Sequence, residues 1–310
     1  MIVFIDVLKK TGLRKSGFAE KILLSFAVRL FDVLPHRAAL TLGALLGALL
    51  RVFARRKVDR AEARCVAALG VGVTPARAIV RASFVNMGKS AAEFARFGRL
   101  APRLKSLFSI EGKERLDEVL ARGKGAIFMA AHFDNWELAG ARMAAEGYSV
   151  MPIYTPQRNG SGLNDLISAR RAAMGMKMIP SEGFGLRELL RALRGGSIVI
   201  FMQDLDARKE GVVVPFLGLP ASTATGLVKM HRKFGTPVVA VFPTRNPDGV
   251  HHTVHIGKVV SDLLDEDGSP FGTNMEKSLK MCNNILGEWV KSYPEQWMWL
   301  LDKWEFTRPF

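Results

Sequence analysis

Residues 130–137 read Ala130-Ala131-His132-Phe133-Asp134-Asn135-Trp136-Glu137 and form the most informative stretch of the chain. An apolar run over residues 125–131 leads into it and predicts a buried strand that delivers the histidine at its end. The sequence then predicts a helix over Trp136–Glu146. A histidine and a carboxylate five positions later, placed across such a strand-to-helix turn, can form a general base and the group that orients it. That pair suits deprotonation of an alcohol that then attacks an acyl group.

Downstream of residue 106, strand-like runs alternate with helical ones. This rhythm predicts an α/β fold with a mostly parallel sheet and helices on both faces. We expect strands at Ala126–Ala131, Ser149–Tyr154, Lys177–Pro180, Ser197–Gln203 and Pro237–Pro243. The other expected helices are Asn164–Met174, Leu186–Arg194, Thr225–Phe234 and Asn274–Ser292. His251–Val260 alternates in polarity, which predicts an antiparallel strand at the edge of the sheet.

The composition narrows the class of partner. The chain has 310 residues, is 48% hydrophobic and carries a net charge of +15, so anionic partners are expected. Nucleic acid, an anionic membrane and an acidic protein each fit that charge, but the chain has no recognisable nucleic-acid motif and we expect no nucleic-acid partner. Its two cysteines, Cys65 and Cys282, indicate neither a disulfide framework nor a cysteine-based metal site, which favours a reducing cytosolic setting.

The basic excess coincides with an apolar N-terminal region. Residues 1–60 hold 12 Lys and Arg against 4 Asp and Glu, and two apolar segments between residues 22 and 50 are broken at Pro35. The uncharged run Ala38–Leu50 is shorter than the roughly 20 residues of a spanning helix. We therefore expect residues 1–58 to form a membrane-associating helical region, with its basic residues on lipid phosphates, and residues 59–310 to form the main domain. A true span and a buried amphipathic helix are the alternatives. The positive-inside rule places the basic cluster, and the rest of the chain after it, in the cytoplasm.

In this interpretation His132 is the general base, and Glu137 fixes the tautomer of its ring and stabilises the imidazolium. A second interpretation remains open for the carboxylate. Asp134-x-x-Glu137 also matches a capping box, with Asp134 as N-cap and Glu137 at the third helical position. A histidine buried in a core and satisfied there is the corresponding alternative for His132.

Further polar residues lie in or after two other expected elements. Asp204 and Asp206 end a buried strand, and Arg170 and Arg171 lie on a helix that can reach the same face. The arginines either grip phosphates or form a solvated basic surface. The two carboxylates can be metal ligands, but we favour pairing with Arg170, Arg171 or Arg208.

As a whole, the chain resembles the late acyltransferases of lipid A biosynthesis, the lauroyl and myristoyl transferases within the lysophospholipid acyltransferase superfamily. The resemblance covers nearly the whole chain. It rests on Ala130–Glu137, the strand end Gln203-Asp204-x-Asp206, the segment Gly211–Thr225, and Tyr293-Pro294-Glu295-Gln296-Trp297-x-Trp299. It departs from the family pattern at Tyr154–Arg158, where Arg158 would replace an expected arginine, and at Asp302, which stands where a basic residue is usual.

The resemblance implies a glycerol-phosphate-acyltransferase-like α/β domain on the cytoplasmic face of the bacterial inner membrane, acting in lipopolysaccharide biosynthesis. It implies acyl carrier protein as the acyl donor and a hydroxyl of an acylated glucosamine disaccharide as the acceptor. Inner-membrane phospholipid would be a further contact. The catalytic pair maps to His132 and Glu137, and substrate-binding positions map to Arg158, Arg170, Arg171, Asp204 and Asp206.

Transfer would be direct, with a backbone N–H or an arginine stabilising the oxyanion, and no cofactor or metal is expected. The sequence has no G-x-S-x-G elbow, which argues against an α/β-hydrolase. The alternatives are an acyltransferase acting on another glycolipid, an ornithine lipid or a lysophospholipid, and a thioesterase in which His132 activates water. A metal site at His251, His252 and His255 is disfavoured, because positions four apart in a strand lie too far apart to share one ion.

Overall fold

The computed structural model describes residues 28–154, 169–180 and 185–309. Its strands are β1 (Phe108–Glu111), β2 (Ala126–Ala130), β3 (Val150–Tyr154), β4 (Ile179–Pro180), β5 (Ile198–Met202), β6 (Val212–Phe216), β7 (Leu219–Thr223), β8 (Val238–Arg245) and β9 (His252–Val259). Its helices are α3 (His36–Phe53), α4 (Arg55–Leu69), α5 (Val73–Ala95), α6 (Phe97–Leu100), α7 (Leu104–Leu107), α8 (Lys113–Ala121), α9 (Trp136–Ala145), α11 (Gly185–Arg194), α12 (Gly226–Phe234) and α13 (Met275–Ser292).

Seven strands form the main sheet, in the order β1-β9-β8-β2-β5-β3-β4. The pairings of β2 with β5 and β8, and of β3 with β4 and β5, are parallel, which confirms the mostly parallel α/β prediction. The strands β6 and β7 form a separate antiparallel hairpin within the segment after Gly211.

The prediction that residues 251–260 form an edge strand is wrong in one respect. β9 does pair antiparallel with β8, but β1 pairs with its other side and takes the edge. Residues 108–111 were not expected to form a strand. β1 has only four residues, too few to give a reliable alternation in the sequence.

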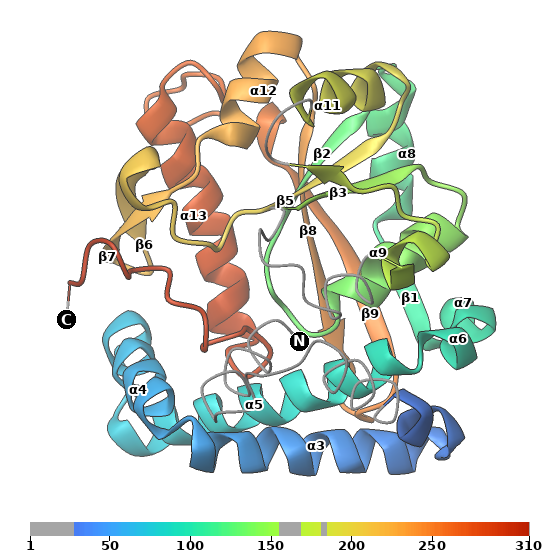
Figure 1. Cartoon of the computed structure of the whole chain (residues 1–310). Coiled ribbons are helices and arrows are strands. Elements are labelled where there is room, and N and C mark those ends of the chain that lie inside the picture. Colours follow the sequence, from blue (N-terminus) through green and yellow to red (C-terminus); the bar gives the residue numbers. More distant parts are fainter. Residues whose placement is uncertain (1–27, 155–168, 181–184, 310) are drawn as a thin grey trace.

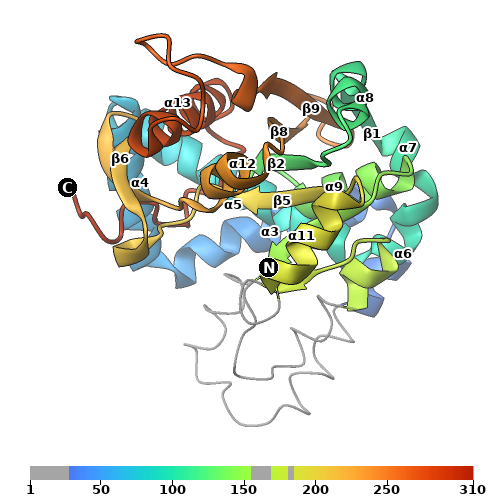
Figure 2. The same cartoon turned by 90° about the horizontal axis from the view of Figure 1, so that it is seen from above.

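Helices cover both faces of the sheet, and α9 and α13 lie on opposite sides of it (Figures 1 and 2). Successive side chains of a strand point to opposite faces of the sheet, so the strands contribute to two hydrophobic clusters, one on each face. Ile127 and Val199 belong to the cluster that includes residues of α11, α12 and α13, whereas Phe128 and Ile198 belong to the cluster with residues of α8 and α9. All five residues of β2 are buried, as expected for a central parallel strand.

The helix α3 packs along α5, and the two lie across the end of the sheet at which β2 terminates (Figure 1). Glycines allow this close approach. A Cβ added to Gly43 would lie 2.5 Å from the carbonyl oxygen of Gly88, and one added to Gly47 would lie 2.2 Å from that of Phe84. In the described part of the chain, α3 alone is long and apolar enough by itself to cross a membrane, and 28% of that window is buried inside the protein.

Candidate active site

The ring of His132 lies just beyond the end of β2 and pairs with Asp204, just beyond the end of β5. Nδ1 of His132 is 2.8 Å from Oδ1 of Asp204, and the backbone N–H of His132 donates to Oδ2 at 2.8 Å. The carboxylate is fully buried, while the histidine side chain is 16% exposed. Since Asp204 accepts at Nδ1, the proton sits on that nitrogen and Nε2 is left as the basic atom.

The parallel register explains why these two residues meet. β2 and β5 are neighbours, with Ala130 opposite Met202. Two residues further along each chain, positions 132 and 204 therefore lie side by side at the carboxyl end of the sheet. Burial acts to raise the pKa of Asp204, but the attraction of His132 and the hydrogen bonds from His132 and Trp297 hold it below its ordinary value. The carboxylate is thus ionised at neutral pH.

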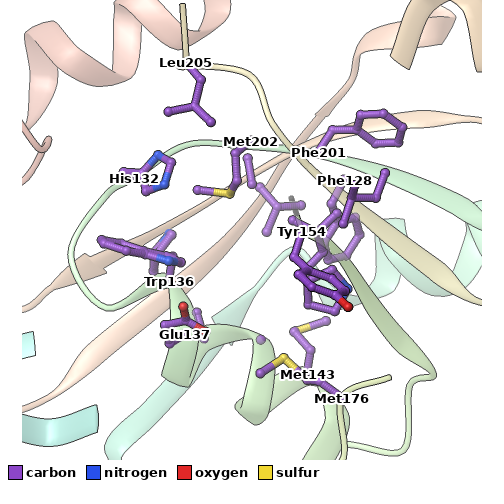
Figure 3. Close-up of a pocket in the computed structure, with 18 of the residues that line it drawn as sticks. Phe128, His132, Trp136, Glu137, Met143, Tyr154, Met176, Phe201, Met202 and Leu205 are labelled. Carbon is purple, nitrogen blue, oxygen red and sulfur yellow. The ribbon is translucent and has the colours of Figure 1, made fainter. Parts of the chain in front are cut away.

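The sequence interpretation paired Glu137 with the His132 ring, but in the structure the two side chains have other partners. Its carboxylate instead pairs with both ends of the Arg171 guanidinium, with Nε of Arg171 donating to Oε2 at 2.8 Å. Trp136 stands beside His132, with ring centroids 4.8 Å apart, and Glu137 lies further into α9 (Figure 3). The carboxylate that pairs with the ring is that of Asp204, which the resemblance implied to be a substrate-binding residue.

The capping-box interpretation is also corrected. The N-cap of α9 is Asn135, whose side chain accepts a hydrogen bond from the N–H of Leu138 at 3.1 Å. Asp134 is instead buried and has a φ of 38°, a left-handed conformation that asparagine and aspartate tolerate better than most residues. Its side chain points away from the helix, into a cluster of charges.

That cluster joins Asp134 to Glu93, Arg245 and His252, all of which are buried. Arg245 grips Glu93 with two hydrogen bonds of 2.9 and 2.7 Å, and its Nη2 lies 3.2 Å from Asp134. Nδ1 of His252 pairs with Asp134, and Nε2 lies 3.1 Å from Glu93. Each ring nitrogen of His252 faces a carboxylate, so His252 is an imidazolium. The negative charges of Asp134 and Glu93 are therefore balanced by the positive charges of Arg245 and His252. The cluster anchors the loop that carries His132.

We expect this cluster to make the stability of the protein depend on pH above neutrality. Burial acts to lower the pKa of His252, but Asp134 and Glu93 outweigh it and raise the pKa to about 9. The stabilisation is therefore complete below the unfolded pKa of roughly 6.5 and is lost as pH rises through about 9. Thermal unfolding followed from pH 6 to 10 should show a falling Tm, and the fall should flatten in a His252→Gln variant. An equal slope in both proteins would contradict the assignment.

The other predicted site residues are scattered. Nη1 of Arg170 points toward Gly98 of α6, where an added Cβ would lie 3.8 Å away, and Arg158 lies outside the described residues. Asp206 accepts hydrogen bonds from the backbone N–H groups of Arg208 at 2.9 Å and Phe306 at 2.8 Å. The expected pairing of Asp204 or Asp206 with arginine side chains is therefore wrong. His132 and the Trp297 indole donate to Asp204, and main-chain N–H groups donate to Asp206.

The three histidines of the β9 region have separate partners. His251 pairs with Asp248, His252 joins the buried charge cluster, and His255 lies 3.0 Å from Glu111. Within the described ranges, His, Cys, Asp and Glu side chains form no group of three or more that could hold a metal ion.

A cavity of about 710 Å³ opens beside His132 and runs between α9 and one face of the sheet (Figure 3). Its polar lining includes His132, Glu137, Arg171 and Asp206. The rest is mainly apolar, and β2 and β8 contribute alternate residues that share a face. Among these lining residues are Phe128, Ala130, Ala139, Gly140, Met143, Met176, Ile200, Met202, Val241 and Val254. An apolar cavity that is lined in part by a base can hold a hydrocarbon chain with its reactive end at the histidine.

The family model and the relatives that match this chain are all described as acyltransferases. The family model described as bacterial lipid A biosynthesis acyltransferase matches residues 9–305. A lipid A biosynthesis lauroyltransferase of Escherichia coli (strain K12) is 27% identical over 67% of this chain and 64% of its own length. A palmitoleoyltransferase of the same strain is 24% identical over 89% of this chain and 87% of its own.

A lipid A biosynthesis acyltransferase of Haemophilus influenzae is 26% identical, over 61% of this chain and 57% of its own length. The match thus spans less than two thirds of the Haemophilus enzyme and of the lauroyltransferase. A phosphatidylinositol mannoside acyltransferase of Mycobacterium tuberculosis is 28% identical, but over only 44% of this chain.

Proposed function

Because the chain belongs to the bacterial lipid A biosynthesis acyltransferase family, we propose that it transfers a fatty acyl group from a thioester to a hydroxyl of a lipid A precursor. The observation that carries this proposal is the mainly apolar cavity lined in part by His132, whose ring pairs with the buried Asp204. Such a cavity suits an acyl chain, and the histidine–carboxylate pair suits activation of a hydroxyl.

The proposed reaction needs no acyl-enzyme. Nε2 of His132 takes the proton of the acceptor hydroxyl, and the oxygen attacks the thioester carbonyl carbon. The tetrahedral intermediate then expels the thiolate as the C–S bond breaks, and the imidazolium returns its proton to sulfur. Asp204 accepts the hydrogen bond from Nδ1–H throughout and stabilises the imidazolium. A buried aspartate has the same role in Ser-His-Asp triads.

We propose that Glu137 acts through Arg171 instead of through His132. The carboxylate holds the guanidinium in the lining of the cavity, where Arg171 can contact an anionic group of either substrate. Substrate-binding roles for Arg158, Arg170 and Asp206 remain proposals that the family resemblance motivates. Asp206 has the best support among these, because it lines the cavity.

Acyl carrier protein is the proposed donor. The net charge of +15 favours an acidic partner, and the same positive charge would attract a negatively charged acceptor lipid. The cytoplasmic face of the inner membrane is the proposed location, because acyl carrier protein thioesters are cytosolic.

The proposal is tested by incubating the detergent-solubilised protein with acyl carrier protein thioesters and a tetra-acylated lipid A precursor, followed by mass spectrometry of the lipid. We expect a new ester on the precursor. Turnover only with a glycolipid, an ornithine lipid or a lysophospholipid would replace the acceptor, and the similarity to a mannoside acyltransferase makes a glycolipid the second candidate. Release of free fatty acid without dependence on any acceptor would indicate a thioesterase.

We further propose that α3 lies in the membrane interface, parallel to the surface. One of its sides is held against α5 by the glycine contacts, while Leu45, Leu49, Val52 and Phe53 are exposed by 50 to 70%. These four positions recur at helical spacing and form one apolar face. The exposed Arg55, Arg56 and Arg60 come after it and can contact lipid phosphates. A helix attached along its length to the domain has only its free face available for lipid.

This orientation predicts equal membrane depth along the helix. Bimane attached to Leu45→Cys, Leu49→Cys or Phe53→Cys, in protein reconstituted into anionic vesicles, should be quenched alike by lipid-borne quenchers. The native cysteines Cys65 and Cys282 are buried, so labelling should be selective. Leu264→Cys, at another exposed leucine, serves as the control and should stay unquenched. A steady change of depth from residue 45 to residue 53 would instead indicate a span.

A further inference from the structure

The segment after α13 lies against both loops of the proposed catalytic pair. The backbone N–H of Met298 donates to the carbonyl oxygen of His132 at 3.0 Å, and the N–H of Asp134 donates to that of Gln296 at 3.0 Å. Phe133 and Trp297 thus form an antiparallel bridge. Trp297 and Trp299 are fully buried and absent from the lining of the cavity.

Trp297 also contacts the carboxylate directly. Its indole N–H donates to Oδ2 of Asp204 at 2.9 Å, and neither side chain has any exposed surface. The same oxygen accepts the backbone N–H of His132, while Oδ1 faces the imidazole ring. The indole bond therefore fixes the plane of the carboxylate in the orientation that presents Oδ1 to Nδ1.

We propose that Trp297 is a positioning residue for the acyl-transfer reaction, setting the orientation and basicity of Asp204 from the C-terminal segment. This inference rests on the proposed function, specifically on the pairing of His132 with Asp204. The indole is a neutral donor, so it stabilises the carboxylate without competing with the imidazolium that forms during proton transfer.

Lys303, from the same segment, fixes the main chain on either side of Asp204. Its buried ammonium donates to the carbonyl oxygens of Gln203 at 3.1 Å and Leu205 at 3.0 Å, and to that of Ser222 at 3.2 Å. The ionisable side chains around the Asp204 carboxylate are therefore His132 on one side and Lys303 on the other. Asp206 also interacts electrostatically with Lys303. The side chain and the flanking backbone of Asp204 are thus both held by residues 297–303.

The experiment compares Trp297→Phe with Trp299→Phe in the full-length protein. Both tryptophans are fully buried, and the indole N–H of Trp299 donates to the carbonyl oxygen of Pro294 at 2.8 Å, away from the catalytic pair. Each change removes the same volume and one buried N–H. A hydrogen bond to a charged group is worth enough that Trp297→Phe should lower kcat about 10- to 100-fold beyond Trp299→Phe. KM should be nearly unchanged.

The pH profile separates positioning from packing. Without the indole N–H the carboxylate is less stabilised and attracts the protonated His132 ring more strongly. The acidic limb of kcat/KM, which reports loss of the neutral base, should therefore move to higher pH. A fluorinated tryptophan at position 297 is nearly the same size and a stronger donor, and it should move that limb to lower pH. It also tests the proposal if Trp297→Phe fails to fold.

Equal losses in the two phenylalanine variants, or an acidic limb unmoved in both the Trp297→Phe and the fluorinated protein, would overturn the inference. That result is distinct from failure of the proposed function, in which the wild-type protein would form no new ester on any lipid acceptor. It is also distinct from failure of the catalytic pair, which would appear as full transfer activity in a His132→Ala variant.

Discussion

His132→Ala is expected to lower kcat for acyl transfer by about two orders of magnitude or more, because it removes the proposed acceptor of the hydroxyl proton. KM for the thioester should change little, since most of the acyl cavity is built from apolar residues of the strands and α9. The measurement is steady-state transfer from the acyl carrier protein thioester to the lipid acceptor, with circular dichroism to verify folding.

His251→Ala is the matched control for this change. His251 also pairs with an aspartate, Asp248, but both are exposed and lie away from the cavity. Its activity should equal that of the wild type. Transfer that survives His132→Ala would remove the base from the mechanism, and acyl label left on the protein by donor alone would replace direct attack with a covalent route.

Asp204→Asn is expected to be the second most damaging change, costing about two to four orders of magnitude in kcat. The amide has the same shape, but it loses the charge that stabilises the imidazolium and can donate to Nδ1, which favours the wrong tautomer. Burial makes the effect large, because no water can replace the carboxylate at Nδ1. The double variant with His132→Ala should be little worse than either single variant, since the two residues act as one unit.

Glu137→Gln provides the contrast that decides between the two carboxylates. It keeps the size of the side chain but weakens its pairing with Arg171, so a rise in KM larger than the fall in kcat is expected. If Glu137→Gln instead reduces kcat more than Asp204→Asn does, the sequence interpretation of Glu137 as the partner of His132 is restored.

Much of the fold is predictable from local patterns. The fully apolar run before His132 required a central strand, and the alternation of apolar runs with helical segments required a mostly parallel sheet. The break at Pro35 also lies immediately before α3. The four-residue β1 escaped prediction because so short a strand carries almost no periodic signal.

The partner of His132 could not be obtained in the same way. Glu137 is near in sequence, and a carboxylate in the first turn of a helix is a reasonable orienter. Asp204 is 72 positions away, and its role depends on β5 being the neighbour of β2. The sequence does contain a signal, since both strands end in a polar side chain at equivalent positions, but strand order is needed to interpret it.

Local periodicity and short motifs were enough to predict the class of sheet, the position of His132 at a strand end and the family that the chain resembles. The pairing of Asp204 with His132, of Glu137 with Arg171 and of Trp297 with Asp204 depends on the folded chain instead. These contacts join residues up to 93 positions apart, and the order of the strands and the return of the C-terminal segment bring them within hydrogen-bonding distance.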